Sequence, residues 1–395
     1  MKPFADRLNL LGTETAFEVL ARAKALEAQG KEIIHMEIGE PDFDTPEHIK
    51  QAAKEALDAG YTHYTPAAGL TPVRQTIADY IAETRHIPVE AENVVVVPGG
   101  KPIMFYAIMA LVDPGDQVIY PNPGFPIYES MINFVGGVAV PLPLREERQF
   151  SFDLDEFKSL VGPRTKLIIL NSPGNPCGGV MSRADLEGVA EMALKYDCYV
   201  LSDEIYSRIL YDGEHFSIAA LPDMQERTII LDGFSKTYAM TGWRLGYGVM
   251  NRNLAAWVTK LMVNSNSCTA AFTQMAGIAA LTGDQTPVRQ MVAEFRRRRD
   301  IIVAGLNEIP GIRCCMPRGA FYAFPNVSGL IARGLGANAK AIADRLLNEA
   351  GIATLAGTSF GHYGEGYLRL SYATSTDNIH KALARIRAWS GSQPI

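Results

Sequence analysis

The feature that most restricts the fold is a block from about residue 90 to residue 250, in which short apolar, β-branched runs alternate with helical patterns. Strands of a parallel sheet are joined by crossover helices and covered on both faces, so they read as continuous apolar runs. We predict strands at residues 94–97, 118–120, 167–170, 199–201, 228–231 and 245–249. Ser182 is the expected N-cap of a helix between two of them. The block predicts an α/β domain with a mostly parallel central sheet flanked by helices.

The remaining segments show longer helical patterns and fewer strands. A chain of 395 residues exceeds what one ordinary core supports, so more than one domain is expected. We expect residues 1–44 to form an N-terminal arm and part of a small domain. Residues 45–288 would form the large domain, and residues 289–395 would complete the small α+β domain from both chain ends.

Composition excludes several classes of function. A formal net charge of -6 is the wrong sign for binding nucleic acid, which relies on many Lys and Arg contacts to phosphate. The run RRRR at 296–299 lies within a helical pattern that puts most of its arginines on the face opposite the apolar residues. We therefore expect a solvated face there and not a phosphate or partner site.

The cysteine and histidine patterns point to a reduced, metal-free protein. The five cysteines are odd in number and form no CxxC pair, which favours a cytoplasmic setting. The seven histidines are scattered and form no HExxH motif, so no metal site is expected. No segment approaches the roughly 20 apolar residues of a membrane span, and the N-terminus does not read as a signal peptide.

Four stretches place polar or glycine residues directly after predicted strands. They are VVVVPGGKP at 94–102, IILNSPGNPCGG at 168–179, YVLSDEIYSRI at 199–209 and TIILDGFSKT at 228–237. In an open α/β sheet the ligand binds beyond the carboxyl ends of the strands. The four stretches therefore predict one shared crevice.

Two of these stretches suggest a phosphate and a ring nitrogen as ligands. Gly99, Gly100 and Lys101 lead into an apolar helix, and free backbone N–H groups at a helix N-terminus favour phosphate, although a plain tight turn reads the same way. Asp203 can pair with a protonated ring nitrogen, and Tyr206 can reach the same ring. The alternative is an N-cap followed by a core tyrosine.

The other two stretches offer an amide and an amine. Asn175 could present its amide to a ligand oxygen, or it could serve turn chemistry alone. Lys236 and Arg244 lie eight positions apart, and two confined cations imply an anion or electrophile between them. A low-dielectric pocket with Arg244 nearby would depress the pKa of Lys236 and make it a nucleophile. Lysine as Schiff base with an acidic partner for the pyridinium nitrogen is the known arrangement of pyridoxal phosphate enzymes.

Together with these motifs, further stretches complete a known pattern. They are IGEPDF at 38–43, YTPAAG at 64–69, YPNPGFPIY at 120–128, FSKTYAMTGWRLGY at 234–247, GAFY at 319–322 and GEGYLRLSYA at 364–373. The sequence resembles the class I and II aminotransferases of the aspartate aminotransferase superfamily, which are pyridoxal 5'-phosphate enzymes of fold type I. The resemblance covers nearly the whole chain.

The resemblance implies roles at the cofactor ring. Lys236 would form the Schiff base and move the proton between the two carbon positions. Asp203 would keep the ring nitrogen protonated. Asn175 and Tyr206 would hydrogen-bond the phenolic oxygen of the ring. Phe125 would stack on the ring, unless it is a core phenylalanine.

The resemblance also implies how the phosphate is held and how the subunits assemble. Gly100 and Lys101 would contribute backbone N–H groups, Ser235 its hydroxyl and Arg244 its guanidinium. Tyr64 would reach the phosphate of a neighbouring subunit, which implies a homodimer with shared active sites.

For the substrate, the family pattern assigns the α-carboxylate to Arg369, a planar bidentate donor, with Gly39 and Asn175 in support. Phe17 lies in the segment that covers the site in the family and would favour a neutral or aromatic side chain, unless it only packs. Cys177 and Ala356 depart from the family's usual Thr and Pro, which leaves fine loop geometry open.

The implied reaction moves an amino group from an L-amino acid to a 2-oxo acid, with 2-oxoglutarate as the default acceptor by family habit. The nearest alternative is a β-eliminating carbon–sulfur lyase on the same fold, because the same electron sink serves both reactions. A ligand-sensing regulator would need a nucleic-acid-reading module, for which the chain has no room before residue 30. A dehydrogenase is unsupported, since no GxGxxG follows a first strand.

Overall fold

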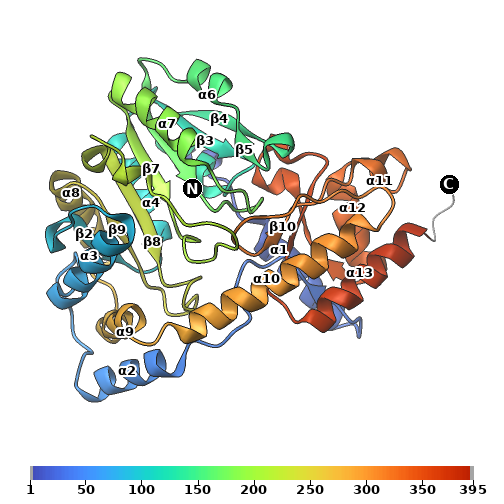
Figure 1. Cartoon of the computed structure of the whole chain (residues 1–395), viewed down its shortest axis with the longest axis horizontal. Coiled ribbons are helices and arrows are strands. Elements are labelled where there is room, and N and C mark those ends of the chain that lie inside the picture. Colours follow the sequence, from blue (N-terminus) through green and yellow to red (C-terminus); the bar gives the residue numbers. More distant parts are fainter. Residues whose placement is uncertain (1–2, 392–395) are drawn as a thin grey trace.

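The computed structural model describes residues 3–391 and contains a mixed sheet of eight strands (Figure 1). Its order is β2-β9-β8-β7-β6-β3-β4-β5. The bounds are β2 Val94–Val97, β3 Gln117–Asn122, β4 Val138–Arg145, β5 Ser151–Phe152, β6 Thr165–Asn171, β7 Tyr199–Asp203, β8 Thr228–Gly233 and β9 Gly246–Val249. Strands β8, β7, β6, β3 and β4 run parallel to one another, whereas β9 is antiparallel to both β2 and β8, and β5 is antiparallel to β4.

Helices cover both faces of this sheet, and the alternation of side chains along β2 shows how. Val95 and Val97 pack in a core cluster with residues of α4 and α8, whereas Val94 and Val96 pack with residues of α2, α3 and α9. Successive strand residues point to opposite faces, so a strand buried on both sides is apolar at every position. The helices of the large part of the molecule are α2 Glu47–Asp58, α3 Thr71–Arg85, α4 Lys101–Leu111, α5 Ile127–Phe134, α6 Leu154–Leu160, α7 Arg183–Lys195, α8 Arg252–Val263 and α9 Ala271–Thr282.

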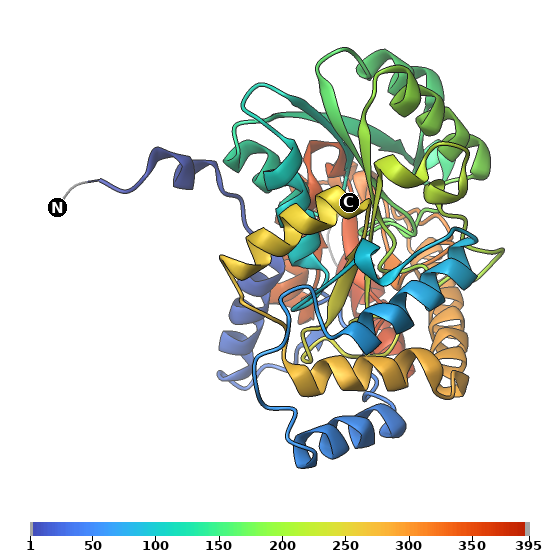
Figure 2. The same ribbon diagram turned by 90° about the vertical axis from the view of Figure 1, so that its left-hand side faces the viewer.

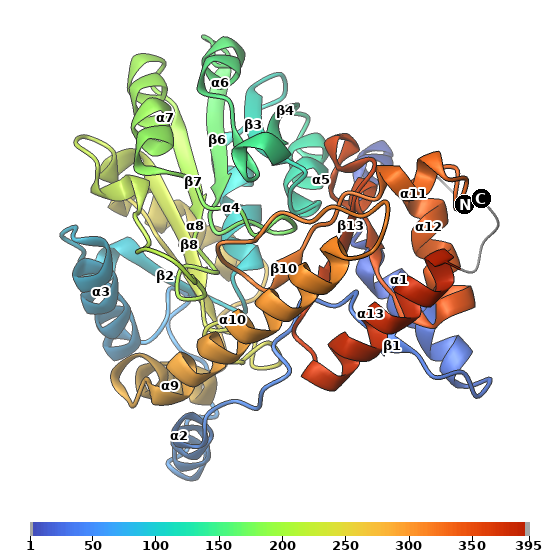
Figure 3. The same ribbon diagram turned by 45° about the vertical axis from the view of Figure 1, so that its right-hand side comes forward.

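The two chain ends together build the smaller part. Strand β1 (Ile34–His35) pairs in parallel with β11 (Ile352–Ala353), and β13 (Leu368–Ser371) lies between β10 (Tyr322–Ala323) and β12 (Leu355–Ala356). Helices α1 Thr15–Glu27, α10 Thr286–Asn307, α11 Ser328–Ala332, α12 Ala339–Arg345 and α13 Thr376–Gly391 belong to this part. Figure 3 shows α10 crossing from α9 toward these helices, and Figure 2 shows the segment before α1 extending away from the body.

The predicted α/β class and its mostly parallel sheet are confirmed. All six predicted strands are present, and Ser182 caps α7, with its hydroxyl accepting from the backbone N–H of Asp185. The prediction missed β4, which contains two prolines and is only partly buried, and β5, which has two residues. The last predicted strand, β9, is antiparallel to its neighbours.

The proposed domain limits remain a prediction. The limit after residue 288 falls inside α10, where Val288 packs with α2, α3 and α9, whereas Met291 and Phe295 pack with residues from the C-terminal segment. The change of neighbours occurs within one helical turn.

The expectation that most of the run 296–299 faces solvent was wrong for two of its arginines. Arg298 and Arg299 are 6% and 5% exposed. Arg298 pairs with Asp42 from the N-terminal segment, and Arg299 pairs with Asp212. The reason is that α10 is covered on more than one side, so a face opposite its apolar stripe can still meet protein.

Residues 3–391 contain neither a candidate membrane-spanning helix nor a candidate metal-binding cluster. No helix there combines the length and apolar character that crossing a bilayer requires. No group of three or more His, Cys, Asp or Glu in that range is placed to hold a metal ion.

Candidate active site

A cavity of about 510 Å3 opens where the carboxyl ends of the central strands face the small sheets. Its wall draws on three distant regions of the sequence: the N-terminal segment at 14–17 and 38–40, the strand ends of the large sheet, and the C-terminal segment at 355–369. The convergence predicted for the four strand-end stretches is therefore observed.

Lys236 and Arg244 lie at the same edge of the sheet because one hairpin carries both. Strand β8 ends at Gly233 and the antiparallel β9 begins at Gly246, so residues 234–245 leave and re-enter the sheet at one edge. Both side chains line the cavity. This geometry explains how two cations eight positions apart come to face one space.

Lys236 is a partly buried lysine whose amine has a lowered pKa. Its Nζ donates to the backbone oxygen of Gly39 at 2.5 Å. Burial lowers the pKa of Lys236 to about 8, and the charges of Arg369 and Arg244 act in the same direction against the opposing charge of Glu40. A lysine in this state reaches its nucleophilic free-base form near neutral pH.

The loop before α4 forms a cradle beside Arg244. Gly99 has φ +85°, and a Cβ there would collide with the guanidinium of Arg244. Gly100 is the N-cap of α4, and Lys101 is its first residue. Gly100, Lys101, Ser235 and Arg244 all line the cavity. Backbone N–H groups at a helix N-terminus, a hydroxyl and a guanidinium are the donors that a phosphate group requires.

Asp203 ends β7 and is 8% exposed. Tyr128 donates its hydroxyl to Asp203 Oδ2 at 2.6 Å, and the backbone N–H of Ile205 donates to Oδ1 at 3.3 Å. Burial raises the pKa of Asp203 to about 6, although these two hydrogen bonds oppose the rise. The carboxylate therefore stays ionised at neutral pH by a narrow margin and is poised to accept a cationic partner.

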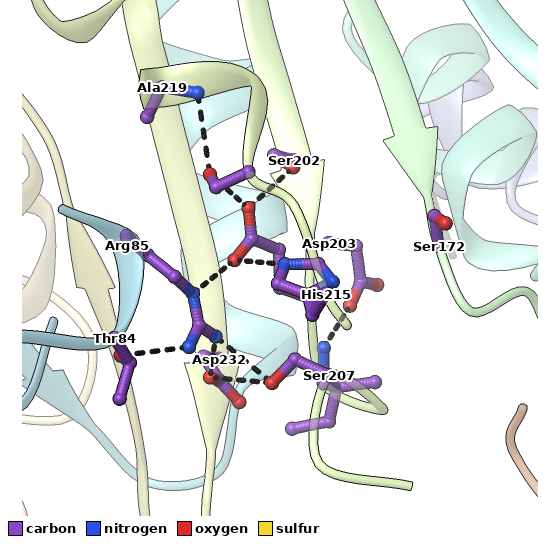
Figure 4. Close-up of polar contacts among 12 residues, drawn as sticks. Thr84, Arg85, Ser172, Ser202, Asp203, Ser207, His215, Ala219 and Asp232 are labelled. Atoms are coloured by element: carbon purple, nitrogen blue, oxygen red, sulfur yellow. Dashed lines mark hydrogen bonds and ion pairs between the residues drawn. The ribbon is translucent and has the colours of Figure 1, made fainter. Parts of the chain in front are cut away.

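A buried ion cluster lies close to Asp203 (Figure 4). Arg85, from the end of α3, donates Nε to Glu204 at 2.8 Å and Nη2 to Asp232 at 3.0 Å. His215 Nε2 lies 2.9 Å from the same Glu204 oxygen that Arg85 contacts. Because Glu204 follows Asp203 directly and Asp232 lies on the neighbouring strand, Arg85 offsets two negative charges next to the site.

Arg369, on β13, is held by two hydrogen bonds from its Nη atoms. Its Nη1 donates to Asn175 Oδ1 at 3.2 Å, and its Nη2 donates to the backbone oxygen of Glu37. The guanidinium lies 4.6 Å from the ring centroid of Tyr322. Its Nε is buried without a hydrogen-bond partner among the described residues. Because Arg369 also lines the cavity and keeps further N–H groups free of these two bonds, its guanidinium can bind an anionic ligand.

Tyr206 lies in the cavity wall, as expected, and its hydroxyl bonds to that of Tyr322 at 2.7 Å. Phe125 also lines the cavity, with its ring edge-on to Tyr128 at 5.7 Å. Phe17 borders the cavity but is 62% exposed. The structure does not bring Tyr64 into this cavity, and its side chain is 89% exposed.

The comparisons with known proteins agree with this geometry. The family model for aminotransferase class I and II matches residues 31–386. The chain belongs to the class I and II aminotransferases. This family depends on pyridoxal phosphate.

Individual relatives match over nearly their full length. The chain is 38% identical to an aspartate aminotransferase of Pyrococcus horikoshii, with 97% of this chain and 96% of that protein covered. It is 37% identical to an aromatic-amino-acid aminotransferase of Thermococcus litoralis, with 97% of each covered. Its fold matches the aspartate aminotransferase of Thermus thermophilus solved with maleate, at a TM-score of 0.92 and 37% identity over 98% of this chain and 100% of that one. The protein is therefore an aminotransferase that acts on amino acids.

Three residues that line the cavity were not predicted from the sequence, although two of them lie in motifs quoted above. Tyr128 ends YPNPGFPIY and Tyr322 ends GAFY, yet neither was assigned. Glu14 lies in no motif, and its carboxylate contacts the Lys101 ammonium. A tyrosine in an apolar stretch reads as core, so only the three-dimensional contacts single these tyrosines out. The two departures from the family pattern, Cys177 and Ala356, are buried, and neither lines the cavity.

Proposed function

We propose that this aminotransferase transfers the amino group of an L-amino acid to a 2-oxo acid through pyridoxal 5'-phosphate attached covalently to Lys236. The observation that carries the proposal is the place of Lys236. It is a partly buried lysine with a depressed pKa, and it shares one cavity with an acid, Asp203, and a phosphate-type cradle at Arg244.

The residues present fit the cofactor at both of its ends. The donors of Gly100, Lys101, Ser235 and Arg244 would hold the phosphate, and a side chain at Gly99 would close the cradle. Asp203 would face the ring nitrogen, which matches an ionised, buried carboxylate in need of a cation.

The remaining ring contacts come from three side chains. Asn175 and Tyr206 would bond the phenolic oxygen of the ring, and Phe125 would cover one ring face. When bound, pyridoxal phosphate supplies an aldehyde for covalent attachment and a cationic ring that accepts electrons from the carbon that loses its proton.

The chain's own groups then account for proton transfer and orientation. Lys236 Nζ, released as a free amine when the substrate amine takes its place, would take the proton from the substrate α-carbon. Arg369, which lines the cavity, would hold the α-carboxylate with its guanidinium, supported by Asn175 and Gly39. Holding the carboxylate fixes the α-carbon relative to the base.

The identity of the amino donor and of the 2-oxo acid acceptor is the next part of the proposal. Relatives named as aspartate and aromatic aminotransferases are equally similar to this chain, so their names do not choose between acidic and aromatic donors. We retain 2-oxoglutarate as the acceptor. Phe17 at the cavity border is consistent with a neutral or aromatic donor.

A homodimer with shared sites remains part of the proposal. Tyr64 is exposed and does not line its own chain's cavity, as expected of a residue that serves a neighbouring subunit.

Two experiments test the proposal. Borohydride reduction of the holoenzyme followed by peptide mapping should place the cofactor on Lys236, and a label on another lysine or none would refute the assignment. A panel of amino donors with 2-oxoglutarate should release oxo acid without ammonia. Ammonia release would favour the alternative, a β-eliminating carbon–sulfur lyase, for which the structure offers no specific support.

A further inference from the structure

The wall of the cavity carries four cationic side chains, and the proposed function uses three of them. Lys236 holds the cofactor, Arg244 holds the phosphate and Arg369 holds the substrate α-carboxylate. Lys101 serves the phosphate only through its backbone, so its ammonium is left for another purpose. That ammonium lies 5.4 Å from the ring centroid of Phe125, and both residues line the cavity.

The Lys101 ammonium already has an anionic partner. It pairs with the carboxylate of Glu14, and within residues 3–391 this is the one ion pair between two side chains that line the cavity. The side chains of Glu14 and Lys101 are 21% and 46% exposed, so water and a substrate can reach the pair.

The Glu14 side chain makes this contact and does not cap its own helix. It occupies the N-cap position of α1, where Ser, Thr, Asp or Asn normally bond the helix N-terminus, yet its side chain makes no capping hydrogen bond. The next residue, Thr15, has a buried hydroxyl without a partner and also lines the cavity. The start of α1 therefore contributes two polar residues to the cavity wall.

We propose that Glu14 is a specificity-determining residue whose carboxylate takes the place, over Lys101, that the distal carboxylate of a dicarboxylic substrate would occupy. The proposal rests on the proposed function and deepens it. With the pair intact, this end of the cavity is neutral overall and favours amino acids with uncharged side chains. A dicarboxylic substrate must first displace Glu14, so it is admitted at a cost and not excluded.

The test compares Glu14→Gln with Glu18→Gln in the holoenzyme. Both variants remove one carboxylate from α1 or its cap, but Glu18 is exposed and does not line the cavity. The ratio of kcat/KM for aspartate to kcat/KM for phenylalanine, measured in the donor half-reaction, should rise about fivefold in Glu14→Gln, which is the upper end for a partly exposed ion pair. The ratio should stay unchanged in Glu18→Gln.

A binding measurement tests the same proposal without turnover. Maleate has two carboxylates and no group to transfer, and its dissociation constant should fall about fivefold in Glu14→Gln. In the double variant Glu14→Gln/Lys101→Met both gains should vanish, because the ammonium that the glutamate had masked is gone.

An unchanged aspartate preference and an unchanged maleate affinity in Glu14→Gln would overturn the proposal, as would equal gains in Glu18→Gln or gains that survive Lys101→Met. Failure of the proposed function looks different. In that case no donor would react in the wild type, and maleate binding would still report on Glu14.

Discussion

Tyr128→Phe removes one hydroxyl that hydrogen-bonds to a single carboxylate. The effect of the change can therefore be measured as a change in the pKa of that carboxylate. The hydroxyl donates to Asp203 Oδ2 at 2.6 Å, and Tyr128 is fully buried. Phenylalanine keeps the ring and its packing. The change therefore tests whether Tyr128 keeps Asp203 ionised.

The magnitude follows from the type of hydrogen bond. A hydrogen bond to a charged group contributes about 1.5–3 kcal/mol, which changes a protonation equilibrium about 10- to 100-fold. The pKa of Asp203 is about 6 with the bond in place. At pH 7 the ionised fraction should fall from about 90% to between about 50% and 10%.

The assay is the pH dependence of kcat/KM for an amino donor. A carboxylate that loses its donor is protonated at higher pH, so the acid limb of the profile should move toward neutral pH by about one to two pH units. Activity on the alkaline side of the limb should recover.

Tyr106→Phe is the matched control. Tyr106 is another buried tyrosine whose hydroxyl bonds to Ser265 and Asn266, away from the cavity. It should leave the acid limb in place. An acid limb that does not move in Tyr128→Phe, or that moves equally in Tyr106→Phe, would refute the reasoning.

Three further predictions address binding and stability. Arg369→Ala should raise the KM of amino donors at least tenfold through the lost α-carboxylate contact, and an unchanged KM would remove Arg369 from the site. Arg85→Met should lower the free energy of unfolding in urea by about 3–5 kcal/mol because buried carboxylates lose their cation, whereas Arg252→Met, at an exposed pair, should cost at most about 1 kcal/mol. Gly99→Ala should displace the Arg244 guanidinium and weaken cofactor binding in equilibrium titration; undiminished affinity would contradict the cradle.

The sequence was most informative where an apolar strand is followed directly by a glycine-rich or polar turn. The central strands were predictable because burial on both faces makes every position apolar, and the glycine-rich turns were recognisable at their carboxyl ends. Strand β4 was missed because Pro141 and Pro143 disfavour the prediction of a strand. In the structure β4 lies next to β5, the short strand at the edge of the sheet.

Contacts between segments that are distant in the chain could not be predicted from the sequence. No local pattern shows that Glu14 meets Lys101, since 87 positions separate them. Burial of Arg298 and Arg299 depends on acids at positions 42 and 212, so a helical pattern alone misassigned them to solvent. Tyr128 lies in an apolar stretch and also packs in the core. The sequence alone therefore did not distinguish it from an ordinary core tyrosine.

The main proposed cofactor contacts and Arg369, the main proposed substrate contact, belong to different sheets. Lys236, Asp203 and Arg244 follow or adjoin strands of the eight-stranded sheet, whereas Arg369 lies on β13 of the three-stranded one. A rotation of one sheet against the other would leave the first group internally unchanged and alter its separation from Arg369. The angle between the two sheets would then depend on the length of the bound substrate. Helix α10 joins the two parts that would rotate.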